Sequence, residues 1–93
     1  MNNVVLKGFI IVPTSDLETV ESELPNHRRL TLSEAGCVSF EVTQCKDKHN
    51  RFDVHEVFVD MAAYEFHQKR VKNSYWGKIS ADVERHYELV SQV

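Results

Sequence analysis

Residues 56–70, EVFVDMAAYEFHQKR, carry two side chains whose types and spacing could do chemistry: the carboxylate of Glu56 and the imidazole of His67. An imidazole changes charge near neutral pH, so its surroundings decide what it does. A buried carboxylate is unfavourable alone, but an imidazole that hydrogen-bonds it relieves much of that cost. The pair is either a structural contact that closes a helix onto a sheet, which is the commoner case, or part of a site. The arrangement of the elements that carry Glu56 and His67 distinguishes between these two possibilities.

The composition bounds the size of the protein and its partners. The chain has 93 residues, of which 42% are hydrophobic and 27% charged, so we expect one globular domain over residues 1–93. A domain this short buries a modest fraction of its surface, which favours oligomerisation. The net charge of −3 and the pI near 5.9 give no basic surface for a nucleic acid or an anionic membrane, so neither is an expected partner.

The two cysteines and the absence of a long apolar run predict the compartment. Cys37 and Cys45 lie on one predicted strand, about 26 Å apart at the rise of a strand, so they cannot pair within it. No secretory segment and no apolar run of roughly 20 residues is present. We therefore expect a cytoplasmic protein without an internal disulfide.

The hydrophobic pattern alternates between strands and helices. Residues 4–12 are rich in β-branched and aromatic residues, and both faces of this strand are apolar. A helix begins near Ser15, and Pro25 should stop or kink it before Gly36 closes it. The other predicted elements are strands at 37–45 and 51–59, a helix after Asp60, a short helical piece at 75–83 and a strand at 84–93.

The order strand, helix, strand, strand, helix, strand is typical of the ferredoxin-like fold, an α+β architecture with one antiparallel sheet. Helices cover only one face of such a sheet. The other face has no cover within the chain, and its candidate apolar side chains are Phe9, Ile11, Val57 and Val59. We therefore expect a homodimer in which sheet packs against sheet.

The periodicities of the third strand and the second helix turn the two chemical side chains toward each other. Alternation places Glu56 on the helix-facing side of its strand, together with Phe52 and Phe58. The sheet-facing stripe predicted for the helix consists of Ala63, Phe66, His67, Arg70 and Val71. We therefore expect His67 to face an internal cavity, with Glu56 close enough to orient it.

An ordered set of residues resembles the antibiotic biosynthesis monooxygenase domain family. The segments GCVSFEV and RFDVHEVFVDMAAYEFH match a pattern of a Gly-Cys strand with an aromatic residue, then a glutamate, a second aromatic residue, an acidic residue, an alanine and a histidine. The matching positions are Gly36, Cys37, Phe40, Glu56, Phe58, Asp60, Ala63 and His67. The resemblance implies a dimeric α+β barrel of two ferredoxin-like subunits, each with a pocket between sheet and helices.

The resemblance also implies an activity. Members of the family oxygenate quinols or polyketide aromatics without metal or flavin, so we expect a cofactor-independent monooxygenase acting on a quinol or polyhydroxylated aromatic. In that role His67 would be the base or a donor to a phenolate, and Glu56 would orient it. The candidate ligand contacts are the apolar Phe40, Phe58 and Trp76, the cationic Arg70, and Tyr75 and His27. Neither a cofactor nor a metal is expected.

Other members of the family bind and degrade haem or process small signalling molecules, so membership does not by itself define the reaction. Haem-degrading relatives have an asparagine within the first strand and a tryptophan where this chain has Phe58, so haem degradation is not expected. Two other functions stay open: a non-catalytic dimer that binds a small ligand, and an isomerase of a small signalling molecule.

Overall fold

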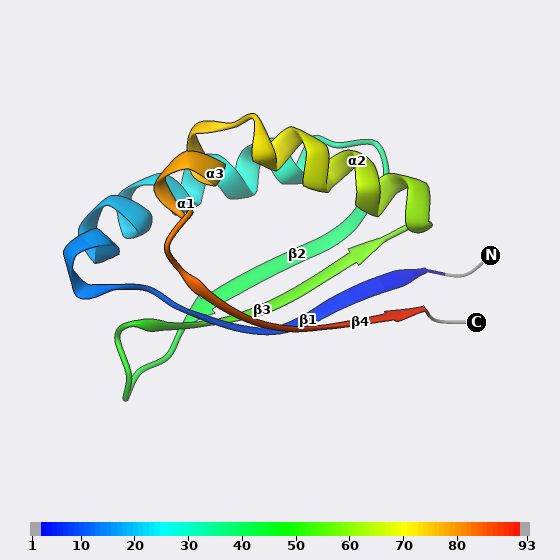
Figure 1. The fold of residues 1–93 in the computed structure, drawn as a ribbon. Helices are drawn as coiled ribbons and strands as arrows, with labels where there is room; N and C mark the ends of the chain where they lie inside the picture. Colours follow the sequence, from blue (N-terminus) through cyan, green and yellow to red (C-terminus); the bar gives the residue numbers. More distant parts are fainter. Residues whose placement is uncertain (1–2, 92–93) are drawn as a thin grey trace.

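The computed structural model describes residues 3–91, which form a four-stranded antiparallel sheet with helices on one face (Figure 1). In chain order the elements are β1 Val4–Ile11, a 3-10 turn Thr14–Asp16, α1 Leu17–Leu32, β2 Cys37–Gln44, β3 Arg51–Phe58, α2 Met61–Lys72, α3 Tyr75–Ile79 and β4 Glu84–Ser91. The predicted α+β ferredoxin-like fold is confirmed. The predicted last strand reached residue 93; residues 92–93 lie outside the described part of the chain.

The strand order β2-β3-β1-β4 places β1 and β3 in the centre of the sheet. Leu6 of β1 pairs with Glu56 of β3, and the neighbouring pair is Val5 with Val57. Paired residues of antiparallel strands project from the same face, and successive residues project from opposite faces. The predicted alternation is therefore confirmed: Glu56 lies on the face that the helices cover, and Val57 lies on the other.

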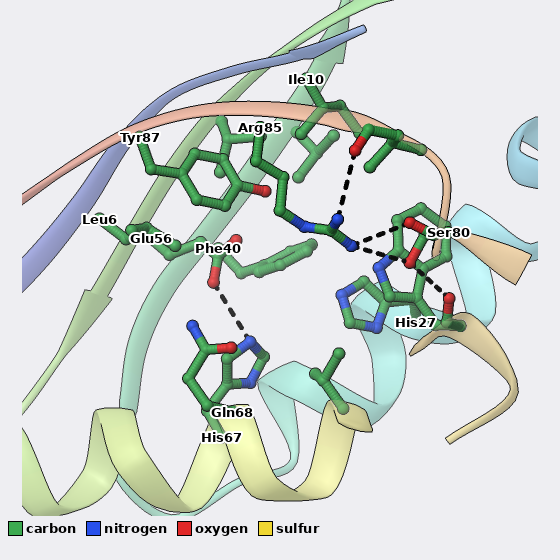
Figure 2. A pocket seen from close by; sticks show the side chains of 15 residues that line it. Leu6, Ile10, His27, Phe40, Glu56, His67, Gln68, Ser80, Arg85 and Tyr87 are labelled. Atoms are coloured by element: carbon green, nitrogen blue, oxygen red, sulfur yellow. Dashed lines mark hydrogen bonds and ion pairs between the residues drawn. The ribbon is translucent and has the colours of Figure 1, made fainter. Parts of the chain in front are cut away.

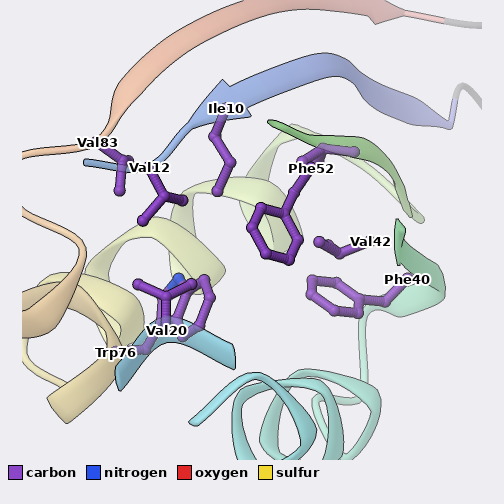
Figure 3. Close-up of a cluster of buried hydrophobic side chains, with 9 residues drawn as sticks. Ile10, Val12, Val20, Phe40, Val42, Phe52, Trp76 and Val83 are labelled. Carbon is purple, nitrogen blue, oxygen red and sulfur yellow. The ribbon is translucent and has the colours of Figure 1, made fainter. Parts of the chain in front are cut away.

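A core of buried apolar side chains holds the helices to the sheet (Figure 3). Burying each such side chain contributes roughly 1.5–3 kcal/mol, so this cluster fixes the helices at one height above the sheet. That position sets the distance between α2 and the strands below it. The core consists of Ile10, Val12, Val20, Phe40, Val42, Phe52, Val54, Trp76 and Val83.

The predicted end of the first helix at Pro25 is wrong, because α1 continues as one helix through this residue. A proline inside a helix removes one amide donor, here the one that would bond to the carbonyl of Glu21. Both Pro25 and Glu21 are exposed, so water can bond to this carbonyl. The cost of the proline is therefore small enough for the packed helix to continue.

Gly36 does not close α1 as a left-handed C-terminal glycine. The helix ends at Leu32, and Gly36 instead allows a close approach of the following loop to α2. A Cβ atom on Gly36 would lie only 2.4 Å from the Cβ of Ala63. The loop between α1 and β2 therefore rests directly on the first turn of α2.

The inward side of α2 is narrower than predicted. His67 is buried and Ala63, Arg70 and Val71 are partly buried, whereas Phe66 is exposed, so its predicted place on the sheet-facing stripe is wrong. The helix contacts the rest of the chain mainly along one line of residues four apart, and Phe66 lies beside this line. Within residues 3–91, no helix has the length and apolar character needed to cross a membrane.

Candidate functional site

Glu56 and His67 face each other between β3 and α2, as expected (Figure 2). Asp60 fixes the start of α2, because its side chain accepts a hydrogen bond from the backbone amide of Ala63 at 2.8 Å. His67 then lies one turn after Ala63, pointing toward the sheet. Its Nε2 atom is 3.3 Å from Oε1 of Glu56, and the two residues are only 4% and 5% exposed.

A second carboxylate, that of Glu34, completes the group. Glu34 lies in the loop after α1, is 8% exposed, and its Oε2 atom is 2.9 Å from Nδ1 of His67. The same oxygen accepts a hydrogen bond of 2.6 Å from Nε of Arg70, whose Nη2 donates to the hydroxyl of Thr31 at 3.0 Å. His67 is thus held between two buried carboxylates, and one of them is also paired with a guanidinium.

The surroundings of His67 favour its charged form. Burial alone would lower the pKa of His67, but the contacts with Glu56 and Glu34, and their negative charges, outweigh burial and raise it. As an imidazolium, His67 donates its Nδ1–H to Glu34 and has Nε2 within ion-pair distance of Glu56. The two carboxylates, the imidazolium and the guanidinium of Arg70 then sum to zero, which makes their joint burial tolerable.

Glu56 keeps one oxygen available for another donor. Its Oε1 atom is within ion-pair distance of His67, but the contact is not aligned as a hydrogen bond. Within the described residues this buried oxygen has no hydrogen-bond partner. Buried carboxylate oxygens normally accept hydrogen bonds, so this oxygen, which is ion-paired but has no aligned donor, can accept a hydrogen bond from a ligand or water in the adjacent cavity.

The cavity beside Glu56 and His67 has a volume of about 80 Å³, enough for several water molecules. Phe40 and Trp76 form part of its apolar wall, and Arg85 and Tyr87 of β4 stand at the end away from α2 (Figure 2). The cavity has an apolar lining between polar groups, the polarity pattern of sites that orient a small molecule, and because it is partly open an aromatic ligand would extend beyond its 80 Å³.

His27 forms part of the same wall as a neutral ring. It stacks on Trp76, with ring centroids 4.4 Å apart and planes 4° apart, and it meets Phe40 edge-on at 5.3 Å. Burial, together with the positive charges of His67 and Arg70, lowers the pKa of His27 to about 3. His27 therefore contributes an uncharged aromatic surface at neutral pH.

The structure brings together most of the residues singled out in the sequence. Glu56 and His67 line the cavity with Phe40, Trp76 and His27.

The other three predicted residues lie elsewhere. Phe58 is fully buried behind the cavity, with its ring centroid 4.9 Å from that of His67. Arg70 does not line the cavity and binds Glu34 instead. Tyr75 is exposed and lies outside the cavity, because α3 presents Trp76 and not Tyr75 to the interior.

Sequence reasoning missed Glu34, Arg85 and Tyr87. Glu34 gave one signal: an acidic residue just beyond the C-terminus of a helix is unfavourable for the helix dipole, so it needs a partner elsewhere. Arg85 and Tyr87 occupy alternate positions of β4 and share its helix-facing side. The sequence alone could have predicted that Arg85 and Tyr87 share one side of the strand. No pattern in the neighbouring residues indicated that the helices leave a cavity over this strand.

The two cysteines lie near opposite ends of β2 and both are free thiols. Cys37 is close enough to the site to be affected by it. Burial, with the negative charges of Glu34 and Glu56, raises the pKa of the Cys37 thiol. Cys37 is therefore a neutral thiol at physiological pH.

Residues 3–91 contain no group of three or more His, Cys, Asp or Glu side chains arranged to hold a metal ion.

Three solved structures illustrate the similarity of the fold. A protein of unknown function from Bacteroides thetaiotaomicron, described as a possible oxidoreductase, matches with a TM-score of 0.81 and 18% identity over 97% of both chains. A Nitrosomonas europaea protein, provisionally named an antibiotic biosynthesis monooxygenase, matches with a TM-score of 0.72 and 19% identity. This match covers 97% of this chain and 86% of the other. A Pseudomonas aeruginosa protein matches with a TM-score of 0.74 and 20% identity over 98% of this chain and 92% of the other.

At these identities the structural matches establish the fold alone. Curated proteins gave no significant match to the sequence. The model of the antibiotic biosynthesis monooxygenase family matches residues 4–73, which include β1 through α2 and therefore Glu34, Glu56 and His67. This match covers well over half of the chain, so the protein belongs to the antibiotic biosynthesis monooxygenase family.

Proposed function

We propose that the protein is a cofactor-independent monooxygenase that acts on a quinol or another polyhydroxylated aromatic. The observation that carries this proposal is the buried group of Glu34, His67 and Glu56, beside an aromatic-walled cavity, in which Oε1 of Glu56 is ion-paired with His67 but accepts no aligned hydrogen bond. An aromatic ring would lie against Phe40 and Trp76, and one of its hydroxyl groups would donate to Glu56.

In this reaction the protein has to remove a proton and stabilise an anion. The carboxylate of Glu56 is the group positioned to accept the phenolic proton, because both ring nitrogens of His67 already face carboxylates. His67 would stabilise the phenolate by its positive charge, which acts more strongly at a buried site than in bulk water. Compared with the expectation from the sequence, the base and the orienting residue exchange roles.

The deprotonated substrate supplies the electrons. A phenolate can transfer an electron to dioxygen, after which the two radicals combine to form the new carbon–oxygen bond. Over the whole reaction one quinol and one dioxygen give one hydroxyquinone and one water, so one oxygen atom enters the ring and the other leaves as water. The two electrons for that water come from the quinol, which is why this mechanism requires no other reductant.

The homodimer expected from the sequence forms part of this proposal. The face of the sheet away from the helices carries the partly buried apolar side chains Phe9, Ile11 and Val57, with Val5 beneath them. A second sheet packed on this face would cover them, and it would leave the cavity on the helix side of each subunit unobstructed.

The test is oxygen uptake with a panel of quinols and polyhydroxylated aromatics. Wild-type protein should consume one dioxygen per substrate oxidised, and Glu56→Gln should reduce kcat/KM by about 100-fold or more. Glu65→Gln is the matched control, since Glu65 is exposed on α2, and it should behave as wild type. Binding of these compounds without any uptake would contradict the oxygenase and would support the alternative of a non-catalytic ligand-binding dimer.

A further inference from the structure

Arg85, an exposed residue of β4 at the edge of the cavity, carries a positive charge that no carboxylate balances. Its Nη1 atom donates to the carbonyl of Val83 at 3.3 Å, and its Nη2 atom donates to the carbonyl and the hydroxyl of Ser80 at 2.9 and 3.3 Å (Figure 2). All three acceptors are neutral, and within residues 3–91 Arg85 forms no ion pair. Arg70, in contrast, is paired with Glu34. Arg85 is therefore held in place while its charge stays available.

Tyr87 adds a second donor beside Arg85. The residue is 39% exposed, but its hydroxyl end points into the cavity on the same side as the guanidinium (Figure 2). Burial and the negative charge of Glu56 raise the pKa of Tyr87 to about 12, so the hydroxyl stays protonated. A protonated phenol beside a guanidinium can donate a hydrogen bond to the same anionic group.

The two ends of the cavity therefore complement different chemical groups of a ligand. Glu56, facing α2, offers a carboxylate oxygen that His67 ion-pairs but does not hydrogen-bond, and the β4 side offers the charged and neutral donors of Arg85 and Tyr87. Phe40 and Trp76 belong to the apolar lining. The complementary molecule has a hydroxyl at one end, a flat apolar ring in the middle and an anionic group at the other end.

We propose that the ligand of this cavity is a hydroxyaromatic carboxylate, whose hydroxyl donates to Glu56 and whose carboxylate pairs with Arg85 and Tyr87. This inference rests on the site of the proposed function and narrows its substrate class. The N–H groups of Arg85 that do not bond to Val83 or Ser80 can donate charge-assisted hydrogen bonds to a carboxylate, and an ester or an unsubstituted quinol cannot accept them with equal strength. Arg85 is then the residue that sets specificity for the anionic group.

The test compares 2,5-dihydroxybenzoate with its methyl ester, which replaces the anionic carboxylate by a neutral ester one methyl group larger. Affinities are measured by calorimetry on the intact protein, and the fluorescence of Trp76, the one tryptophan of the sequence, reports occupancy of the cavity. The acid should bind about tenfold or more tightly than the ester, because a hydrogen-bonded charge contributes more than a neutral contact. Equal affinities, or no binding of the acid, would overturn the proposal.

Variants assign the preference to Arg85. Arg85→Gln should bring the ratio of acid to ester affinity to within about twofold of unity. Arg85→Lys should retain part of the preference, since lysine keeps the positive charge but lacks the planar guanidinium donors. Lys69→Gln removes an exposed positive charge from α2 and should keep the wild-type ratio. A preference that survives in Arg85→Gln would overturn the assignment.

The result is separable from the test of the oxygenase. Selective binding of the acid without oxygen uptake would contradict the oxygenase and leave the assignment of Arg85 intact. Oxygen uptake with uncharged quinols, combined with equal affinities for acid and ester, would support the oxygenase and contradict the assignment of Arg85.

Discussion

Glu34 and His67 are held 2.9 Å apart although they come from a loop and a helix that are distant in the sequence. Their contact converts a histidine on a helix into a buried cation with a carboxylate on each side. It also explains why the face of α2 that points to the sheet can carry an imidazole at all.

The raised pKa of His67 predicts a loss of stability at alkaline pH. The folded protein holds the proton of His67 more tightly than the unfolded chain, in which the pKa is near 6.5. The stabilisation is therefore complete below pH 6.5 and is lost as the pH rises through the raised pKa, by at most about 1.4 kcal/mol per pH unit. Urea denaturation between pH 6.5 and 8 measures this decline, and His67→Gln should flatten it. Staying below pH 8 excludes ionisation of Cys37. An equal slope in both proteins would contradict the assignment.

The lowered pKa of His27 predicts the opposite dependence at acidic pH. The unfolded chain binds a proton near pH 6.5, whereas the folded protein does so only at a pKa of about 3. Stability should therefore fall as the pH drops below 6.5, again by up to about 1.4 kcal/mol per pH unit. His27→Phe keeps the ring beside Trp76 and removes the titration. Between pH 6.5 and 5, above the range where most carboxylates titrate, it should lose less stability than wild type. Identical losses would show that His27 is already protonated in the fold.

The contact of Gly36 with Ala63 should control the site from a distance. Gly36→Ala places a methyl group 2.4 Å from the Cβ of Ala63, so the loop and α2 must separate, at a cost of about 1–3 kcal/mol. Because Glu34 lies on this loop, the separation should also lower the pKa of His67 toward its usual value, which NMR titration measures.

A second substitution serves as the control for this contact. Ala63→Gly in the Gly36→Ala background removes the clash and should restore both the raised pKa of His67 and part of the stability, less the cost of a helical glycine of about 1 kcal/mol. No recovery in the double variant would mean that Gly36 is required for another reason.

Arg70 is expected to act through Glu34 and not through the ligand. Arg70→Gln leaves a buried carboxylate without its guanidinium, and since the Arg70 side chain is 23% exposed, water can replace part of the pairing; we expect a loss of about 2 kcal/mol in the free energy of unfolding. The acid-to-ester ratio of ligand affinities should stay as in wild type. A changed ratio would place Arg70 at the ligand, as the family resemblance implied.

The sheet face away from the helices should form the dimer contact. Light scattering at micromolar concentration should give twice the chain mass of 10.8 kDa. Val57→Thr keeps the β-branched shape of the central strand and buries one hydroxyl from each subunit, which should weaken the dimer by about tenfold or more. Circular dichroism checks that the variant folds. A wild-type monomer at these concentrations would contradict the dimer.

The sequence by itself determined the features that depend on local periodicity. Alternation along β3 put Glu56 on the helix side, and the helical repeat of α2 put His67 opposite it, because these periods follow from backbone geometry alone. The order of strands and helices then gave the ferredoxin-like fold. Asp60 could be assigned as the start of α2 because its capping contact spans only three residues.

Tertiary structure decided the features that depend on contacts between distant segments. Glu34 reaches His67 because Gly36 lets a loop rest on α2, and Arg85 and Tyr87 reach the cavity because β4 pairs beside β1. Pro25 stays within α1, although local rules would end the helix there. Such outcomes depend on the sum of many packing contacts across the core, each too small and too distant in sequence to appear in any local pattern.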